Sequence, residues 1–300
     1  MNEFVQQIVN GVAWGSLYAL IALGYTMVYG VLRFINFAHG DVYMIGAMVA
    51  FYAARALLAP GTASTSMFFV LLVLSMVSCG ALGYAIERLA YRPLRQASRL
   101  TALITAIGVS LLLENGGQLL FGPDPKFFPQ LIRSHELSPG SGIVVTNVQV
   151  LILAVSVTLM VGLQLLVFRT RVGTALRAVS YSAETASLMG IDVNRMISLT
   201  FVLGSMLAGA AGVLVGLSNP KIDPLMGIMP GLKAFVAAVV GGIGNIPGAM
   251  VGGVLMGLSE VLVVGYISST YRDAIAFVIL IVVLLVRPSG LFGSSAQEKV

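Results

Sequence analysis

Long apolar segments alternate with short polar segments along the whole chain. The longer apolar segments have about 20 residues or more, and about 20 residues of helix cross the hydrocarbon core of a bilayer. They lie at 5–32, 37–58, 67–86, 101–121, 148–168, 197–217 and 248–267, and a shorter one lies at 274–286. The segment 233–240 is too short to cross alone, and the Gly-rich stretch 241–248 interrupts it. The pattern predicts an all-α polytopic bundle of about eight spans plus one short broken crossing, in one transmembrane domain over residues 1–300.

Two longer polar segments separate these spans. Residues 122–147 have prolines at positions 123, 125, 129 and 139, which predicts an irregular loop rather than a helix. Residues 169–197 contain four arginines and, unlike the other polar stretches, look helical. Lys and Arg concentrate in cytoplasmic loops, so this segment and the Arg-rich loop after residue 86 are predicted to be cytoplasmic. Counting spans then places the 122–147 loop and the N-terminus outside, and the C-terminus inside if 233–240 crosses.

The composition narrows the class of protein. Hydrophobic residues make up 58% of the 300 residues and charged residues 10%, against roughly 25% charged residues in soluble domains. Such a chain predicts an integral membrane protein. The net charge of +5 comes from arginines clustered in the loops and does not indicate nucleic-acid binding. The single cysteine, Cys79, lies in an apolar segment and provides neither a disulfide nor a metal site.

Small residues recur at every fourth position in two predicted spans: Gly11, Gly15 and Ala19, and Gly204, Ala208, Gly212 and Gly216. This spacing puts them on one helix face, where close packing inside the bundle is favoured and a subunit interface is the alternative. In addition, the tetrapeptide at 46–49 recurs at 248–251, each time after a break in the apolar pattern. Such a recurrence is typical of an internal repeat in a transporter.

Ionisable residues inside apolar spans are costly, so each needs a partner or a function. Glu114 lies in a polar patch with Asn115, and Glu260 lies within the span 248–267. For both, pairing inside the bundle and a place on the substrate path are alternative interpretations. For His39 and Asp41, at the break after the first span, turn capping is favoured over ligand contact. Broken helices expose polar groups to a cavity, so the candidate translocation-path residues are Asn36, His39, Asp41, Glu114, Asn245 and Glu260.

Motifs of enzymatic chemistry are missing from the sequence. It contains no G-x-x-x-x-G-K-[ST] loop for nucleotide phosphates, no H-E-x-x-H and no C-x-x-C. The two histidines, His39 and His135, are predicted on opposite sides of the membrane. We therefore expect no catalytic residues, no metal site and no cofactor in this chain, so that ATP driving it would be bound by partner subunits.

The segment 169–197 carries the most specific local pattern. Glu184, Thr185, Ala186 and Gly190 follow the spacing of the E-A-A-x-x-x-G element of ABC importer permeases, with Thr185 where that element has Ala. Small residues give a smooth helix that inserts into a cleft, and a glycine ends it. The alternative is an amphipathic helix lying on lipid headgroups. The candidate residues for coupling to an ATPase are Arg177, Ala183, Glu184, Ala186, Gly190 and Asp192.

Three blocks of sequence, at 11–47, 171–195 and 234–253, resemble the LivH-type permease subunit of bacterial branched-chain amino acid ABC importers. The resemblance extends over about residues 10–292. It implies a multi-pass protein of the bacterial inner membrane that pairs with a second, related permease and contacts lipid. It also implies two cytoplasmic ATP-binding subunits, docked on a coupling helix at 183–190, and a periplasmic substrate-binding protein that delivers leucine, isoleucine or valine.

Two alternatives to this function stay open on the sequence. Related permeases import urea, short amides or other amino acids, and nothing in these residues excludes such solutes. A self-sufficient secondary transporter belongs to another class and would carry solute without ATPases. The sequence shows no series of facing carboxylates and histidines that would indicate a proton relay.

Overall fold

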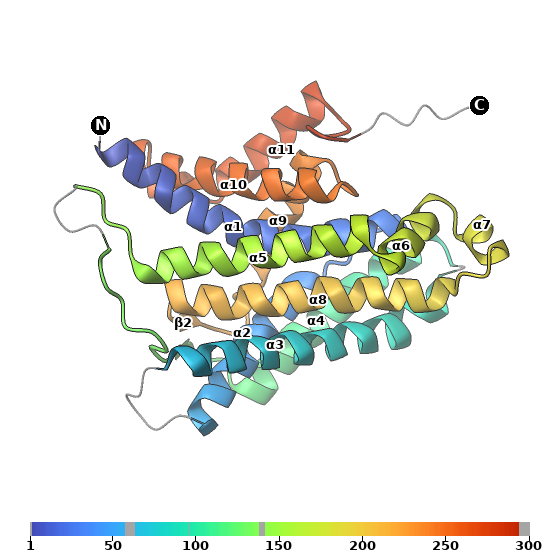
Figure 1. Cartoon of the computed structure of the whole chain (residues 1–300), viewed down its shortest axis with the longest axis horizontal. Helices are drawn as coiled ribbons and strands as arrows, with labels where there is room; N and C mark the ends of the chain where they lie inside the picture. The colour runs from blue at the N-terminus through green and yellow to red at the C-terminus, as the bar shows by residue number, and fades with distance from the viewer. Residues whose placement is uncertain (1, 58–63, 96, 138–141, 294–300) are drawn as a thin grey trace.

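The computed structural model describes residues 2–57, 64–95, 97–137 and 142–293, which form a bundle of long helices (Figure 1). In chain order its α-helices are α1 (Asn2–Leu32), α2 (His39–Leu57), α3 (Thr65–Ile86), α4 (Arg99–Phe121), α5 (Asn147–Arg169), α6 (Arg171–Tyr181), α7 (Ala183–Leu188), α8 (Val193–Ser218), α9 (Ile228–Gly241), α10 (Ile246–Tyr266) and α11 (Ala274–Val286). A π-helical turn, η1 (Glu87–Tyr91), and a 3-10 turn, η2 (Arg92–Leu94), follow α3, and a second 3-10 turn, η3 (Ser269–Tyr271), follows α10. The strands β1 (Lys126–Phe127) and β2 (Lys221–Ile222) pair antiparallel.

Each predicted span corresponds to a helix, but these helices differ in length and polarity. Among the described residues, six are long and apolar enough to cross a membrane: α1, α3 with its continuation to Leu94, α4, α5, α8 and α10. The helices α9 and α11 have only 14 and 13 residues. The helix α2 has 19 residues but is more polar than those six, because it contains His39, Asp41 and Arg55. The predicted polytopic bundle is confirmed, whereas the count of about eight spans plus a broken crossing stays a prediction.

Capping side chains set the starts of several helices. Side-chain oxygens of Ser64, Ser98 and Asp192 accept hydrogen bonds from backbone N–H groups in the first turns of α3, α4 and α8. Thr146 and Gln149 form a reciprocal capping box at the start of α5. Such caps pair N–H groups that the first turn of a helix otherwise leaves without partners. Polar residues between the apolar segments therefore fix where these helices begin.

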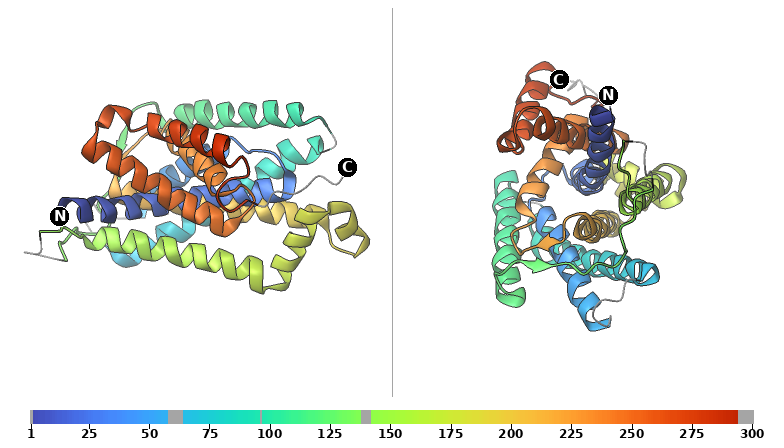
Figure 2. Two further views of the ribbon diagram at one scale, coloured as in Figure 1. Left: turned by 90° about the horizontal axis from the view of Figure 1, so that it is seen from above. Right: turned by 90° about the vertical axis from the view of Figure 1, so that its left-hand side faces the viewer.

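The centre of the bundle consists of α1 and α8, which are mostly buried. By contrast, α4 is mostly exposed and stands at the edge of the bundle, as the right-hand view of Figure 2 shows. Gly15 on α1 lies so close to Val254 on α10 that a Cβ would clash, and Gly212 on α8 lies equally close to Tyr43 and Ala47 on α2. These contacts favour the interpretation that the four-residue spacing of small residues serves packing within the bundle.

Non-helical chain enters the interior of the bundle between α1 and α2. Residues 33–38 lead back from the end of α1, and His39 at the start of α2 lies against Gly24 in the body of α1. Gly227, the N-cap of α9, lies against Gly40 in the first turn of α2. The two helices therefore begin side by side inside the bundle.

The polar loop predicted at 122–147 contains no helix in its described part before Asn147, where α5 begins. Lys126 of β1 pairs with Ile222 of β2, and Glu136 forms an isolated bridge with Thr146. Pro139, one of the prolines that predicted this loop, lies outside the described residues. The loop thus connects α4 to α5 while it packs against the segment that follows α8.

The tetrapeptide shared by 46–49 and 248–251 does not occupy equivalent places. Gly46 lies in the middle of α2, whereas Gly248 lies in the first turn of α10. Each copy also has a glycine six residues before it, at 40 and at 242. Gly40 is helical, whereas Gly242 is the C-cap of α9 with a φ of +103°. The recurrence therefore reflects the apolar, Gly-rich composition and is not an internal repeat at these positions.

Candidate coupling surface and translocation site

The segment predicted to couple to an ATPase forms two helices, α6 and α7, at one end of the bundle (Figure 1). Ser182 separates them, because its backbone is extended and its hydroxyl accepts a hydrogen bond from the Thr185 N–H at 3.2 Å. Gly190, with a φ of +80°, follows the end of α7. A left-handed residue ends a helix, and glycine adopts that conformation without strain. The coupling helix expected at 183–190 corresponds to α7, with Gly190 at its expected end, and α6 precedes it as a separate helix.

Five of the six predicted coupling residues are exposed: Arg177, Ala183, Glu184, Gly190 and Asp192. Ala186 is buried and faces the rest of the chain. Next to them, Tyr181, Leu188 and Met189 are 91%, 84% and 79% exposed. Apolar side chains grouped at a helix end form a surface that a partner can cover. The end of α7 therefore presents such a surface beside the exposed coupling residues.

Arg177 and Asp192 are exposed but also interact within this chain. The Arg177 guanidinium lies over the Phe168 ring of α5, 5.5 Å from its centroid. The Asp192 carboxylate accepts a hydrogen bond from the Arg195 N–H at 3.1 Å and caps α8. Both residues therefore fix the position of α6 and α7 on the long helices.

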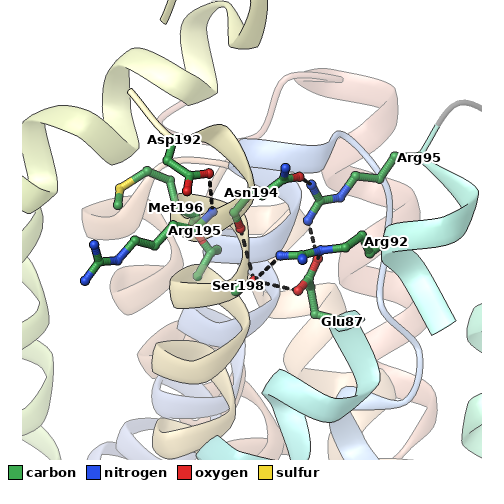
Figure 3. A network of polar contacts seen from close by, with 9 residues as sticks. Glu87, Arg92, Arg95, Asp192, Asn194, Arg195, Met196 and Ser198 are labelled. Carbon is green, nitrogen blue, oxygen red and sulfur yellow. Dashed lines mark hydrogen bonds and ion pairs between the residues drawn. The ribbon is translucent and has the colours of Figure 1, made fainter. Parts of the chain in front are cut away.

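A buried carboxylate, Glu87, joins the ends of α3 and α8 (Figure 3). Its side chain is 0% exposed and accepts hydrogen bonds from Arg92 Nε, at 3.4 Å, and from Arg95 Nη2. Ser198 Oγ on α8 donates a third, at 2.6 Å, and Arg95 also donates to the Asn194 side chain. Burial lowers the pKa of the Arg95 guanidinium and the Glu87 carboxylate opposes this shift, so Arg95 stays charged. The network ties the first turn of α8 to the turn that follows α3.

Directly after α3 the chain makes the π-helical turn η1, a rare feature that is frequent at functional sites. Tyr91 at its end is 1% exposed and donates a hydrogen bond to Asn36 Oδ1 at 2.8 Å. The Tyr91 ring also packs on Phe34, with 5.0 Å between the ring centroids. The side-chain oxygen of Asn36, a predicted path residue, is thus engaged by Tyr91, and residues 33–38 are anchored to η1.

Asp41 and Glu114 come together at a small cavity between α2, α4 and α9. Ser110 on α4 donates a hydrogen bond to Asp41 Oδ2, and its hydroxyl lies 3.5 Å from Glu114 Oε1. The cavity has a volume of about 110 Å³. The rest of its wall is formed mainly by glycines and apolar residues, among them Phe37, Ile228 and Leu232. Two carboxylates therefore face one cavity at the place where α2 and α9 begin.

His39 lies close to this cavity but does not line it. Its ring is edge-on to the Tyr25 ring, with 4.9 Å between centroids, and it packs on Gly24. The His39 Nε2 atom has no hydrogen-bond partner among the described residues. The histidine therefore packs the start of α2 against α1.

Glu260 belongs to a cluster of charges between α1, α9 and α10, in which Glu260 and Lys233 are buried and Arg272 and Asp273 are about half exposed. Tyr18 donates a hydrogen bond to Glu260 Oε2 at 2.7 Å, and Lys233 Nζ lies 3.1 Å from the same oxygen. Lys233 also pairs with Asp273 Oδ1 at 2.7 Å, and Arg272 Nε pairs with Glu260 Oε1. The side chains of Lys233 and Glu260 are 5% and 4% exposed. Of the two interpretations for Glu260, pairing inside the bundle is the one these contacts favour.

Asn245 interacts with backbone groups. Its side-chain oxygen accepts a hydrogen bond from the Gly248 N–H at 3.0 Å and caps α10, and its amide donates to the Phe292 carbonyl at 2.9 Å. Asn245 thus holds the chain after α11 against the break between α9 and α10.

A larger cavity, of about 690 Å³, lies between α1, α5, α8 and the 122–147 loop. Trp14, Gln149 and His135 are on its wall. Among the described residues its wall contains no carboxylate, and it shares no lining residue with the cavity at which α2 and α9 begin. We therefore place the candidate substrate site at the smaller cavity, where charged groups and helix ends meet.

Three residues in these sites escaped prediction from the sequence: Glu87, Tyr91 and Ser110. Glu87 is followed by arginines five and eight positions later, a signal for an ion pair at a helix end. Ser110 precedes Glu114 by one helical turn, so a shared face could have been inferred. The partner of Tyr91, Asn36, is 55 residues away in the sequence, and no local pattern indicates that contact.

Comparisons with known proteins give consistent matches over almost the whole chain. The model of the family described as "Branched-chain amino acid transport system / permease component" matches residues 7–284. The "High-affinity branched-chain amino acid transport system permease protein BraD" of Pseudomonas aeruginosa is 46% identical, over 99% of this chain and 98% of the relative. The permease protein LivH of Escherichia coli K12 is 45% identical with the same coverage, and a probable LivH of Methanocaldococcus jannaschii is 31% identical over 95% and 91%. Among solved structures, PsaBC from Streptococcus pneumoniae in complex with Fab matches with a TM-score of 0.45 and 15% identity, over 97% of this chain and 92% of that one.

Proposed function

Because this chain belongs to the family of permease components of branched-chain amino acid transport systems, we propose that it imports leucine, isoleucine and valine across the bacterial inner membrane. It is a multi-pass membrane protein and one component of a multi-component transport system. The remaining components are a second, related permease, two cytoplasmic ATP-binding subunits and a periplasmic substrate-binding protein. ATP binds to those subunits and not to this chain. The N-terminus lies outside and the C-terminus in the cytoplasm.

The cavity at Asp41 and Glu114 is the observation that supports this substrate class most directly. A branched-chain amino acid carries an ammonium, a carboxylate and an aliphatic side chain. Carboxylates bridged by the hydroxyl of Ser110 suit the ammonium, since two like charges at one site are relieved by a cation. The aliphatic side chain fits the apolar wall that Ile228 and Leu232 contribute.

The starts of α2 and α9 supply the complementary charge for the substrate carboxylate. The first N–H groups of a helix are unpaired and carry a partial positive charge, which favours an anion nearby. Gly227, the N-cap of α9, makes no side-chain capping bond. In the first turn of α9 the Ile228 N–H donates to the Leu225 carbonyl and Pro230 has no N–H, so the Met229 N–H is the one without a partner among the described residues. Discontinuous helices whose N-termini meet a substrate carboxylate are a recurring device of membrane transporters.

The ATP-binding subunits dock on α6 and α7. The exposed residues Ala183, Glu184 and Gly190, with the apolar side chains of Leu188 and Met189, form the docking surface. Closure of the two ATP-binding subunits moves this surface and switches the permease between outward and inward access. The position of α6 and α7 at one end of the bundle, opposite the N-terminus, is compatible with a cytoplasmic location (Figure 1).

Uptake of labelled leucine by the complete complex in proteoliposomes tests this function. The wild-type complex is expected to accumulate leucine only when ATP and the binding protein are present. Replacing either cavity carboxylate, as Asp41→Asn or Glu114→Gln, removes a charge-assisted contact, so we expect uptake to fall about tenfold or more. The matched control is Glu136→Gln, because Glu136 is an exposed carboxylate in the 122–147 loop. Equal uptake by all four proteins would contradict the site, and no ATP-dependent leucine uptake by the wild type would contradict the function.

The same preparation separates the alternatives. A self-sufficient secondary transporter would move leucine down an ion gradient when this chain is reconstituted alone, whereas the proposed function predicts no flux. Urea and short amides carry no ammonium, so a cavity with two carboxylates offers them no matched charge. An excess of urea or acetamide should therefore leave leucine uptake unchanged, and valine should compete with it.

A further inference from the structure

A line of contacts, buried at Glu87 and at Tyr91, connects the coupling helices α6 and α7 with the Asp41 cavity. We propose that Glu87 is the positioning residue at the centre of this line, which makes the first turn of α8 and residues 33–38 move as one unit. The proposal rests on the proposed function and adds the residues that transmit the movement. Glu87 and Tyr91 do not line the cavity, so they act on the substrate site through other residues.

The first step joins α7 to α8. The Ile191 N–H donates a hydrogen bond to the Ala186 carbonyl at 3.1 Å, and Asp192 caps α8 through the Arg195 N–H. Only residues 189–192 separate the two helices. A connection this short and this strongly hydrogen-bonded transmits a displacement of α7 to the first turn of α8.

The second step passes from α8 to the turn after α3 (Figure 3). Ser198 is 6% exposed and binds Glu87 Oε2 directly, at 2.6 Å, and Asn194 one turn earlier binds Arg95. A buried carboxylate that loses its cationic and hydroxyl partners is strongly disfavoured. The start of α8 therefore shifts together with η1, because separating them would break the Ser198–Glu87 and Asn194–Arg95 contacts at once.

The third step leads from η1 to the cavity. Tyr91 binds Asn36 through its hydroxyl, and its ring packs between Phe34 and Phe201, with 5.0 and 5.3 Å between ring centroids. Asn36 directly precedes Phe37, which lines the cavity together with Asp41. The turn η1 also packs against α4, the helix that contributes Ser110 and Glu114 to the opposite wall. Movement of η1 thus reaches both walls of the cavity.

A second contact holds the other end of the same segment. Among the described residues, Arg33 is the one non-glycine residue with a positive φ, at 57°. Its Nη2 lies 3.5 Å from the Ser180 carbonyl at the end of α6. A bulky residue in the left-handed region persists where its surroundings fix it, and such strain is concentrated at switch regions. Residues 33–38 are therefore held at one end by α6 and in the middle by η1.

The test uses a cysteine at position 37 as a reporter of the segment. The native Cys79 is 0% exposed, so a thiol reagent reads the Phe37→Cys side chain. In the complete complex we compare the maleimide labelling rate without nucleotide and with ATP plus vanadate. We expect the two labelling rates to differ in the Phe37→Cys protein, which is the parent of the further variants. The ratio of these two rates should shrink about two- to thirtyfold when Glu87→Gln or Tyr91→Phe is added. Tyr91→Phe retains the ring packing and removes only the hydroxyl that binds Asn36.

Tyr52→Phe is the matched control. It also removes one tyrosine hydrogen bond, to the Phe121 carbonyl at 3.1 Å, but on the opposite part of α2 and outside the line of contacts. The proposal is wrong if Tyr91→Phe and Glu87→Gln show the same ratio of labelling rates, with and without nucleotide, as Tyr52→Phe. It is also wrong if labelling at position 37 of the parent does not depend on nucleotide. If Glu87→Gln does not fold, Tyr91→Phe decides, since it leaves the buried charges intact.

The labelling assay distinguishes this proposal from the transport function on which it rests, because no substrate is needed. If the parent complex shows the nucleotide-dependent ratio, Glu87→Gln and Tyr91→Phe lose it, and the complex does not carry leucine, the proposed substrate is contradicted and the role of Glu87 is supported. If the complex carries leucine and all variants show the same ratio of labelling rates, only the role of Glu87 is contradicted and the transport function stands.

Discussion

Gly40 in the first turn of α2 lies directly against Gly227 at the start of α9. A Cβ on Gly40 would lie 2.6 Å from the Gly227 carbonyl oxygen and 3.1 Å from the Gly231 Cα. Two helix N-termini can meet this closely only where neither backbone carries a side chain between them. The contact brings the positive ends of two helices to the cavity that also holds Asp41.

Gly40→Ala is predicted to reduce transport without preventing membrane insertion. The added methyl group forces α2 and α9 apart, and overpacking of this kind costs about 1–3 kcal/mol. We expect leucine uptake to fall severalfold while the amount of protein in the membrane stays near that of the wild type. The control is Gly108→Ala on α4, where an added Cβ meets no atom within 4 Å. Equal uptake by the two variants would show that the close approach is not needed for transport.

Gly190→Val is predicted to uncouple ATP hydrolysis from uptake. Space is not the constraint, since a Cβ at Gly190 meets no atom within 4 Å; the constraint is its φ of +80°. A β-branched residue in that conformation is strained by about 1–3 kcal/mol, so the end of α7 should rearrange. The measurement is leucine transported per ATP hydrolysed in proteoliposomes. Gly162→Val, at an exposed position in the middle of α5, serves as the comparison, and a normal ratio for Gly190→Val would count against this role of α7.

Lys233→Met is predicted to destabilise the protein. It leaves the buried Glu260 carboxylate with one cation fewer, and breaking a buried ion pair costs about 3–5 kcal/mol. The double variant Lys233→Met with Glu260→Gln should recover part of this loss, because the uncompensated carboxylate is gone. Thermal unfolding in detergent measures both effects, with the exposed Lys221→Met as the control. If Lys233→Met and the single variant Glu260→Gln both unfold like the wild type but lose uptake, Glu260 lies on the substrate path instead.

Hydropathy and loop composition predicted the helical bundle well, because lipid imposes a minimum length on each apolar helix. The pattern at 183–190 also predicted an exposed helical element that ends at Gly190. It did not reveal that Ser182 divides the segment into α6 and α7, since a serine inside a helical pattern can either face solvent or cap a new helix.

Contacts between distant parts of the chain could not be predicted in this way. Asp41 and Glu114 were both singled out by the cost of a charge inside a span, but nothing local shows that Ser110 brings them to one cavity. Glu260 met the same criterion and instead found partners in Lys233 and Arg272. A buried charge in a sequence therefore identifies a residue that needs a partner, and only the fold decides whether that partner belongs to the protein.

The exposed position of α4 has a mechanical consequence for the Asp41 cavity. Ser110 and Glu114 face the cavity from α4, while most of that helix is open to its surroundings. The cavity wall is thus a single helix thick, about 10 Å. A tilt of this one outer helix would open or seal the cavity without repacking the glycine-lined contacts of α1 and α8. A molecule that covers the outer side of α4 would therefore limit how far the cavity can open.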